Sequence, residues 1–94
     1  MSIITLKLNR CQTMTKDDIS KELKSARVGY DYLKITFYNN VYIQVFFTRD
    51  YKTYIKTSSR DLMLWKEIDV IERQPYRLPV LEDFLFRWIL KLNR

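Results

Sequence analysis

Residue types on which many enzymes depend are absent or scarce in this chain of 94 residues. It has no histidine, which excludes imidazole acid–base catalysis and histidine metal ligands. Cys11 is the single cysteine, so the chain can form neither an internal disulfide nor a cysteine zinc cluster. The one glycine, Gly29, is not enough for a phosphate-binding loop. We therefore expect a binding protein rather than an enzyme.

Two pairs of carboxylates are the remaining candidates for metal chemistry. Asp17 and Asp18 are adjacent, but their place in the first turn of an expected helix is explained by the helix dipole. Asp69 and Glu72 have a spacing that puts them on one helix face, yet no third ligand accompanies them in the sequence. We therefore expect neither a metal nor a cofactor.

One enzymatic alternative needs no histidine. Small ribonuclease toxins can work with Arg, Lys and Tyr side chains alone, and this chain shares their size, basic charge and expected α+β character. The sequence contains none of their motifs, and its single early helix differs from their usual helical hairpin. A histidine-free ribonuclease toxin is thus the minor alternative.

Basic and aromatic residues gather in the middle of the chain. The net charge is +6, and residues 24–60 alone carry +5 of it, together with six of the seven tyrosines. Exposed rings can stack nucleobases, at about 1–3 kcal/mol per base, while neighbouring lysines neutralise phosphates. This pattern indicates a nucleic-acid-binding surface. Its candidate residues are Lys34, Tyr42, Arg49, Lys52, Tyr54, Lys56 and Arg60.

The same residues have a purely structural explanation. Tyr, Phe and Thr are favoured in any strand, and lysines on a sheet surface or edge oppose aggregation. If the terminal helices covered this face, its rings would belong to the core. The functional interpretation therefore depends on whether the face is open to solvent.

Strands must position these residues. Asn39 and Asn40 mark a hairpin, and a loop of residues 38–40 places Asn40 at a left-handed position that Asn tolerates. That loop pairs Leu33 with Val45, Ile35 with Ile43 and Phe37 with Val41 on one face, and Tyr32 with Phe46, Lys34 with Gln44 and Thr36 with Tyr42 on the other. After a turn near 49–50, residues 51–57 form a further strand, with Thr53 and Ile55 on one face and Lys52, Tyr54 and Lys56 on the other.

The expected order begins with a strand and a helix. Ile4, Leu6 and Leu8 alternate with polar residues, as in a half-buried strand. Thr15 and Asp18 have the spacing of a capping box for a helix over residues 16–27, which Gly29 ends as a left-handed stop. Cys11 lies between strand and helix and is best explained as a small packing residue.

Two helices follow the strands. Ser58 with Asp61 repeats the capping-box spacing, and Leu64, Ile68 and Ile71 recur at helical intervals, although residues 67–72 could also form a strand. The last helix contains Pro79 in its first turn. Its broad apolar face consists of Leu81, Phe84, Leu85, Trp88, Ile89 and Leu92.

A second apolar side of the last helix is the candidate partner surface. Phe86 and Leu90 project away from the main apolar face, and Arg87 lies between them in the sequence. A helix that is apolar on two sides is either buried between layers or offers a surface to a partner. The occupant would be another protein or a second copy of the chain. Core packing is the alternative, because a small domain needs its large apolar groups for its own core.

These elements predict a single domain, residues 1–94, of the α+β class: a small antiparallel sheet of about four strands, in the order β-α-β-β-β-α-α, packed against helices. We expect a non-enzymatic protein that contacts nucleic acid through its basic, tyrosine-rich sheet. The alternative is an inhibitor or effector of the anti-CRISPR or host-takeover type, docking on a larger host complex. The single alanine and abundant Lys, Ile, Tyr, Asn and Phe follow AT-rich codons, as in many phage and mobile-element proteins.

The expected setting is the cytoplasm, including that of a host cell. Residues 1–10 lack the apolar core of a secretory signal, and the single cysteine suits a reducing compartment. No apolar run approaches the roughly 20 residues that span a bilayer. We therefore expect no membrane partner.

Overall fold

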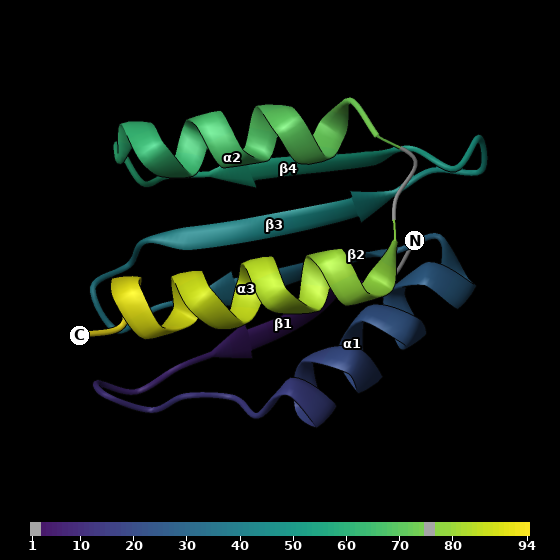
Figure 1. Cartoon of the computed structure of the whole chain (residues 1–94). Helices are drawn as coiled ribbons and strands as arrows, with labels where there is room; N and C mark the ends of the chain where they lie inside the picture. Colours follow the sequence, from purple (N-terminus) through teal and green to yellow (C-terminus); the bar gives the residue numbers. More distant parts are fainter. Residues whose placement is uncertain (1–2, 75–76) are drawn as a thin grey trace.

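The computed structural model describes residues 3–74 and 77–94. Along the chain the elements are β1 (Ile3–Lys7), α1 (Lys16–Gly29), β2 (Tyr32–Thr36), β3 (Tyr42–Phe47), β4 (Thr53–Thr57), α2 (Leu62–Glu72) and α3 (Leu78–Leu92). This is the element order that the sequence predicts, and the fold is α+β (Figure 1). Within the described residues no helix combines the length and apolar character needed to cross a membrane.

The strands form one mixed sheet in the order β1-β2-β3-β4. β2, β3 and β4 are antiparallel neighbours, as predicted, whereas β1 pairs with β2 in parallel. The expectation of an antiparallel sheet is therefore correct for three strands and wrong for the first. The reason is the crossover, because α1 carries the chain back along the sheet and β2 then runs in the same direction as β1 (Figure 1).

The β2–β3 hairpin has the predicted register. Leu33 lies opposite Val45 and Ile35 opposite Ile43, so apolar pairs share one face of the sheet. The loop has three residues, because the amide of Phe37 donates to the carbonyl of Val41 at 2.8 Å. Asn40 adopts the left-handed conformation, with φ of 64°. The alternation of apolar and polar side chains was therefore sufficient to predict the register of this hairpin.

The start of α1 is as predicted, but its end is not. Thr15 and Asp18 form both hydrogen bonds of the capping box. The left-handed residue at the other end is Tyr30, with φ of 51°, so the prediction of Gly29 as the left-handed stop was wrong. Gly29 is the last residue of α1, and a Cβ there would lie 2.3 Å from Oδ2 of Asp31, so that side chain would have to move.

Residues 67–72 are helical, so the strand alternative is wrong. The N-cap of α2 lies three residues after the expected one. Oδ1 of Asp61 accepts hydrogen bonds from the amides of Met63 at 2.9 Å and Leu64 at 3.2 Å. Asp61 is therefore the N-cap, and the assignment of Ser58 to that role was wrong. The hydroxyl of Ser58 is used elsewhere, because it accepts from the amide of Tyr42 at 2.9 Å.

The core lies between the sheet and the helices. The buried strand residues that face the helices are Leu33, Ile35, Phe37, Ile43, Val45, Phe47, Thr53 and Ile55. From α3, the predicted apolar face is buried at Leu81, Phe84, Leu85, Trp88 and Ile89, while Leu92 is half-buried. Cys11 lies outside this core and is exposed, so its assignment as a packing residue was wrong.

The end of α3 is tied to two distant loops by one buried side chain. Nδ2 of Asn93 donates to the carbonyls of Asn9 at 2.7 Å and Gln12 at 2.6 Å. Its Oδ1 accepts from the amide of Tyr38 at 3.4 Å. The loop after β1, the β2–β3 loop and the end of α3 therefore meet at Asn93.

Candidate nucleic-acid interface

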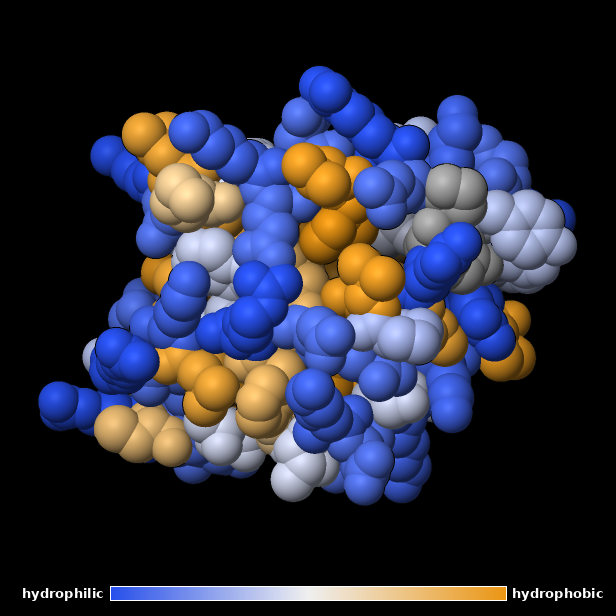
Figure 2. Space-filling model, in the orientation of Figure 1, coloured by the Kyte–Doolittle hydropathy of each residue, from blue (hydrophilic) through white to orange (hydrophobic). Residues whose placement is uncertain are grey.

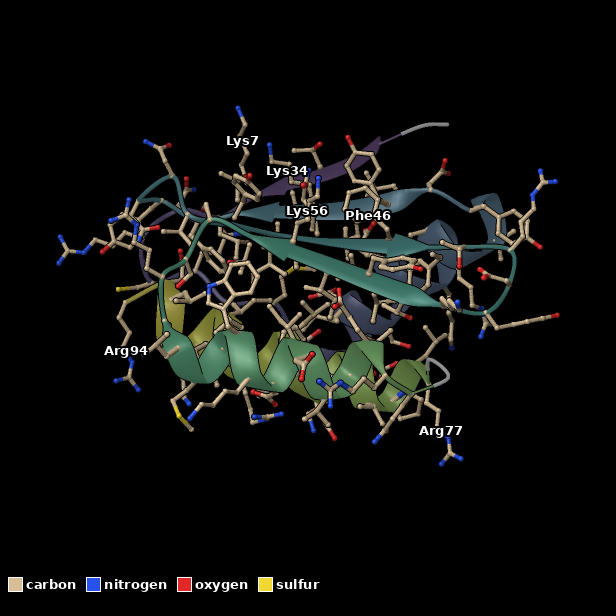
Figure 3. The ribbon with its side chains drawn as sticks, turned by 90° about the horizontal axis from the view of Figure 1, so that it is seen from above. Lys7, Lys34, Phe46, Lys56, Arg77 and Arg94 are labelled. Carbon is tan, nitrogen blue, oxygen red and sulfur yellow. The ribbon has the colours of Figure 1, made fainter. Side chains whose placement is uncertain are left out.

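All described helices pack on one side of the sheet, which leaves the other side open. Figure 3 shows Lys7, Lys34, Phe46 and Lys56 on the side of the sheet away from the helices, and Arg77 and Arg94 on the helix side. We call this side the open face. Its described side chains are Thr5, Lys7, Tyr32, Lys34, Thr36, Tyr42, Gln44, Phe46, Tyr54 and Lys56. Three are lysines, four are aromatic and none is acidic.

The strand register sorts the open face into neighbouring rows. The basic row crosses the sheet through Thr5, Lys34, Gln44 and Lys56. The aromatic row consists of Tyr32, Phe46 and Tyr54, which lie two residues further along each strand in the direction of the β3–β4 turn. A third row on the other side of the basic row contains Lys7, Thr36 and Tyr42, so every ring of the open face lies in or beside a row that carries a lysine.

The rings of the open face contact one another and the lysines. The centroids of Tyr32 and Phe46 lie 4.7 Å apart, with the planes tilted by 32°. Nζ of Lys34 lies 4.7 Å from the ring centroid of Tyr42, and Nζ of Lys56 lies 6.0 Å from that of Phe46. Tyr54 is the most exposed of these rings, at 48 %. The face therefore offers partly packed rings with cations beside them.

The structure brings together four of the predicted binding residues. Lys34, Tyr42, Tyr54 and Lys56 all lie on the open face. The other three lie beyond its ends, with Arg49 and Lys52 in the β3–β4 turn and Arg60 after the opposite end of β4. Arg60 is thus separated from Arg49 and Lys52 by the length of the strand.

Lys52 has an acidic neighbour in the turn. Its Nζ lies 3.7 Å from Oδ2 of Asp50. The Thr48 hydroxyl donates a hydrogen bond to Asp50, and this bond, together with Lys52, holds the pKa of the Asp50 carboxyl below its ordinary value. Part of the positive charge of Lys52 is therefore balanced locally.

Sequence reasoning did not name the remaining basic and aromatic members of the open face as site residues, which are Lys7, Tyr32 and Phe46. Tyr32 and Phe46 share the alternation that selected Lys34 and Tyr42, so the signal for them was present. Lys7 alternates with the apolar residues of β1, but its place beside Thr36 follows from the parallel pairing of β1 with β2.

The predicted partner residues on α3 have different surroundings. Phe86 is half-buried against the core, with Nζ of Lys16 5.7 Å from its ring centroid. Arg87 forms an ion pair with Glu67 of α2. Leu90 is 40 % exposed. Phe86 thus lies beside α1 and Arg87 beside α2, while Leu90 is the most exposed apolar residue of the three.

The carboxylates considered for metal binding have protein partners. Asp69 lies 2.9 Å from the guanidinium of Arg73, and Oε1 of Glu72 accepts from the amide of Ile55 at 2.6 Å. Asp18 is engaged in the capping box with Thr15. Across residues 3–74 and 77–94, no group of three or more His, Cys, Asp or Glu side chains has the arrangement of a metal site.

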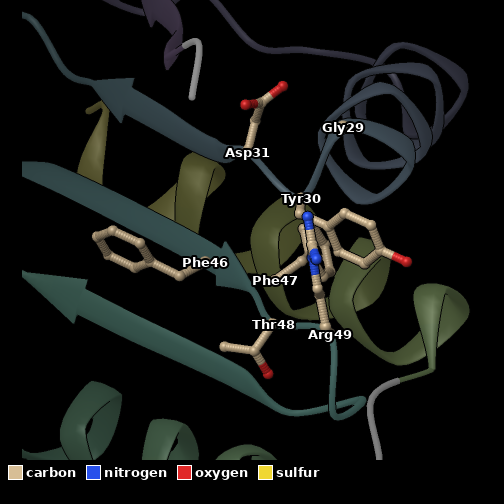
Figure 4. A pocket seen from close by; sticks show the side chains of 7 residues that line it. All are labelled: Gly29, Tyr30, Asp31, Phe46, Phe47, Thr48 and Arg49. Atoms are coloured by element: carbon tan, nitrogen blue, oxygen red, sulfur yellow. The ribbon is translucent and has the colours of Figure 1, made fainter.

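A pocket lies beside the aromatic row, at the β3–β4 turn. Its volume is about 510 Å³, and it is lined by Gly29, Tyr30, Asp31, Phe46, Phe47, Thr48 and Arg49 (Figure 4). Phe46 belongs both to this pocket and to the open face. Cζ of Arg49 lies 5.2 Å from the ring centroid of Tyr30, so the cation lies against an aromatic face.

Comparison with known proteins gives no relative. No protein-family model, no curated protein and no solved structure matches the chain. The function is therefore argued from the geometry of the open face and its pocket.

Proposed function

We propose that the protein binds nucleic acid through the open face of its sheet. The observation that carries the proposal is a solvent-accessible sheet surface that combines three lysines with four aromatic rings and has no acidic member among the described strand residues. Phosphates supply the negative charge that such a surface attracts, and bases supply flat faces for its rings.

Structural packing alone accounts less well for this face. A sheet surface exposed to water needs polar residues, but it does not need four rings beside three lysines. The positive charge also lies next to the rings. The basic row and the aromatic row are two residues apart along each strand, which is a separation of about 7 Å. Phosphate and base of one nucleotide can thus be contacted together.

The test is oligonucleotide binding by a charge-reversed open face. We expect Lys34→Glu combined with Lys56→Glu to weaken binding of a single strand of about 10 nucleotides by at least tenfold at low salt. The slope of log Kd against log salt should become shallower by about 1–2, because two phosphate contacts are lost. Fluorescence anisotropy across a salt series measures both quantities.

The matched control makes the same change in net charge on the other side of the molecule. Lys24 on α1 and Lys66 on α2 are exposed, so Lys24→Glu combined with Lys66→Glu changes the total charge equally. This control should bind within about twofold of the wild type, because its lysines lie away from the proposed contacts. Equal losses in both double variants would contradict the proposal, as would the absence of binding by the wild type.

A protein-binding function is the second candidate, and it rests on the helix side. A groove of about 380 Å³ between α2 and α3 is lined partly by Met63 and Val70, which are 64 % and 56 % exposed. Figure 2 shows that apolar residues on this side form separate patches divided by hydrophilic side chains. Substituting Met63 and Val70 by Asp would abolish capture of a protein partner and leave oligonucleotide binding unchanged.

A further inference from the structure

Three kinds of contact follow one another along the exposed side of β3 and the residue that follows the strand. Gln44 belongs to the basic row, Phe46 to the aromatic row, and Thr48 to the pocket. Successive residues on one strand face are about 7 Å apart, so these contacts lie in a line that ends at the pocket. A nucleotide has the same order of parts, because its base projects from the sugar, away from the phosphate, and carries polar atoms at its rim. A base stacked on the aromatic row would therefore direct its edge into the pocket.

The walls of the pocket suit a flat, largely apolar group. Phe46 borders it on the open face, and Phe47, which is 4 % exposed, contributes buried apolar surface (Figure 4). Its volume of about 510 Å³ falls within the range of roughly 300–1,000 Å³ that small-ligand pockets occupy. Aromatic walls favour a nucleobase over a phosphate, which is strongly hydrated.

Arg49 is the side chain best placed to read the base. It is exposed, it lies over Tyr30, and it forms no ion pair with any carboxylate of the described residues. The Thr48 hydroxyl already donates to Asp50 and accepts from the amide of Lys52. Because Arg49 has no such ion pair, its guanidinium retains N–H donors for a ligand.

A guanidinium distinguishes guanine from the other bases. Guanine presents two acceptors, O6 and N7, at the spacing of the guanidinium fork, and this pair is the commonest specific contact between arginine and a base. Adenine has an amino donor in place of O6, so one of the two hydrogen bonds is lost.

We propose that the pocket at the β3–β4 turn binds one unpaired guanine base, with Arg49 as the residue that determines specificity. This inference rests on the proposed function and deepens it, because it names a single-stranded ligand that contains guanine. The base stacks along Phe46 while its phosphate is held by the basic row.

The test compares single strands that differ at one base. The probes are oligothymidine strands of about 10 nucleotides with one central guanine, adenine or 7-deazaguanine, and anisotropy gives each affinity. We expect the guanine strand to bind about tenfold more tightly than the adenine strand. The 7-deazaguanine strand should lose part of this preference because it lacks N7.

The matched variants are Arg49→Lys and Arg60→Lys. Arg49→Lys keeps the charge but loses the planar fork, so the ratio of guanine-strand to adenine-strand affinity should fall from about tenfold to about one. Arg60→Lys makes the same change at the other end of β4 and should retain the preference. Arg49→Ala provides a second variant at the exposed turn, and a thermal melt verifies folding of each.

The outcomes separate this inference from the proposed function. If the wild type binds guanine and adenine strands equally, or if Arg49→Lys keeps the preference, the guanine pocket is overturned while binding by the open face stands. If Lys34→Glu with Lys56→Glu leaves all affinities unchanged, the open face is not the binding surface and both proposals fail.

Discussion

Thr53 places a polar atom in the core at the start of β4. It is 0 % exposed, and its Oγ1 has no hydrogen-bond partner among the described residues. A buried hydroxyl without a partner costs about 1–3 kcal/mol. We predict that Thr53→Val raises the free energy of unfolding by about 1 kcal/mol, as measured by urea denaturation.

Thr57 on the same strand gives the matched control. Its Oγ1 accepts from the amide of Ser59 at 3.0 Å, so Thr57→Val removes a hydrogen bond that is already made. That variant should not gain stability. A decrease in stability on Thr53→Val would show that its hydroxyl is satisfied in solution.

At the scale of the elements, Glu67 joins α2 to α3. Its carboxylate pairs with Arg87 and accepts from Nε1 of Trp88 at 2.6 Å. Burial raises the pKa of the Glu67 carboxyl, but the hydrogen bonds from Arg87 and Trp88 outweigh it, and the pKa lies below its ordinary value of 4.5. The folded state therefore favours the ionised carboxyl.

The lowered pKa fixes the sign of the pH dependence. The ionised Glu67 carboxylate stabilises the folded state fully above the pKa that this group has in the unfolded chain. This stabilisation is lost as the pH falls through the lower pKa of the folded state. We predict that Glu67→Gln lowers the free energy of unfolding by about 1–2 kcal/mol at about pH 7, and by less at about pH 3.

Urea denaturation at both pH values measures this difference. Glu22→Gln on α1 makes the same change away from this contact and should have a smaller effect at neutral pH. A penalty for Glu67→Gln that grows on acidification would contradict the expected direction of the pH dependence.

The elements also show which features the sequence could predict. The capping box of Thr15 and the Leu33–Val45 register follow from residues close in the chain or from one apolar face, and both are confirmed. The cap of α2 could not be chosen between Ser58 and Asp61 by spacing, because Ser58 is occupied by the amide of Tyr42 on another strand. A hydrogen bond between residues far apart in the sequence therefore determined which residue caps α2.

At the scale of the whole molecule, the candidate site exists because the helices cover one side of the sheet. The alternation of Lys34 and Tyr54 with buried residues was sufficient to place them on one face, but it did not show which face the helices would cover. The pocket was beyond the sequence altogether, because it needs the end of α1 beside the β3–β4 turn. A local pattern thus predicts a face, while tertiary packing determines its exposure.

The side chain of Asn93 joins the end of α3 to the loop after β1 and to the β2–β3 loop. It is 2 % exposed, and its amide satisfies the carbonyls of Asn9 and Gln12 and the amide of Tyr38. Asn93→Ala removes the side-chain partner of the Gln12 carbonyl and of the Tyr38 amide, whereas the Asn9 carbonyl keeps the hydrogen bond from the amide of Gln12. We therefore predict a loss of about 2–3 kcal/mol in the free energy of unfolding. Hydrogen exchange at the amide of Tyr38 should accelerate accordingly.

Asn39 supplies a control of the same residue type. Its Nδ2 donates to the carbonyl of Leu92 at 3.5 Å, and the side chain is exposed, so Asn39→Ala should cost less than about 1 kcal/mol. Nucleic-acid affinity of the folded Asn93→Ala protein should equal that of the wild type, because Asn93 lies on the core side of the sheet. A loss as small as that of Asn39→Ala would mean that water replaces the amide of Asn93, and that the loops are held by their own packing.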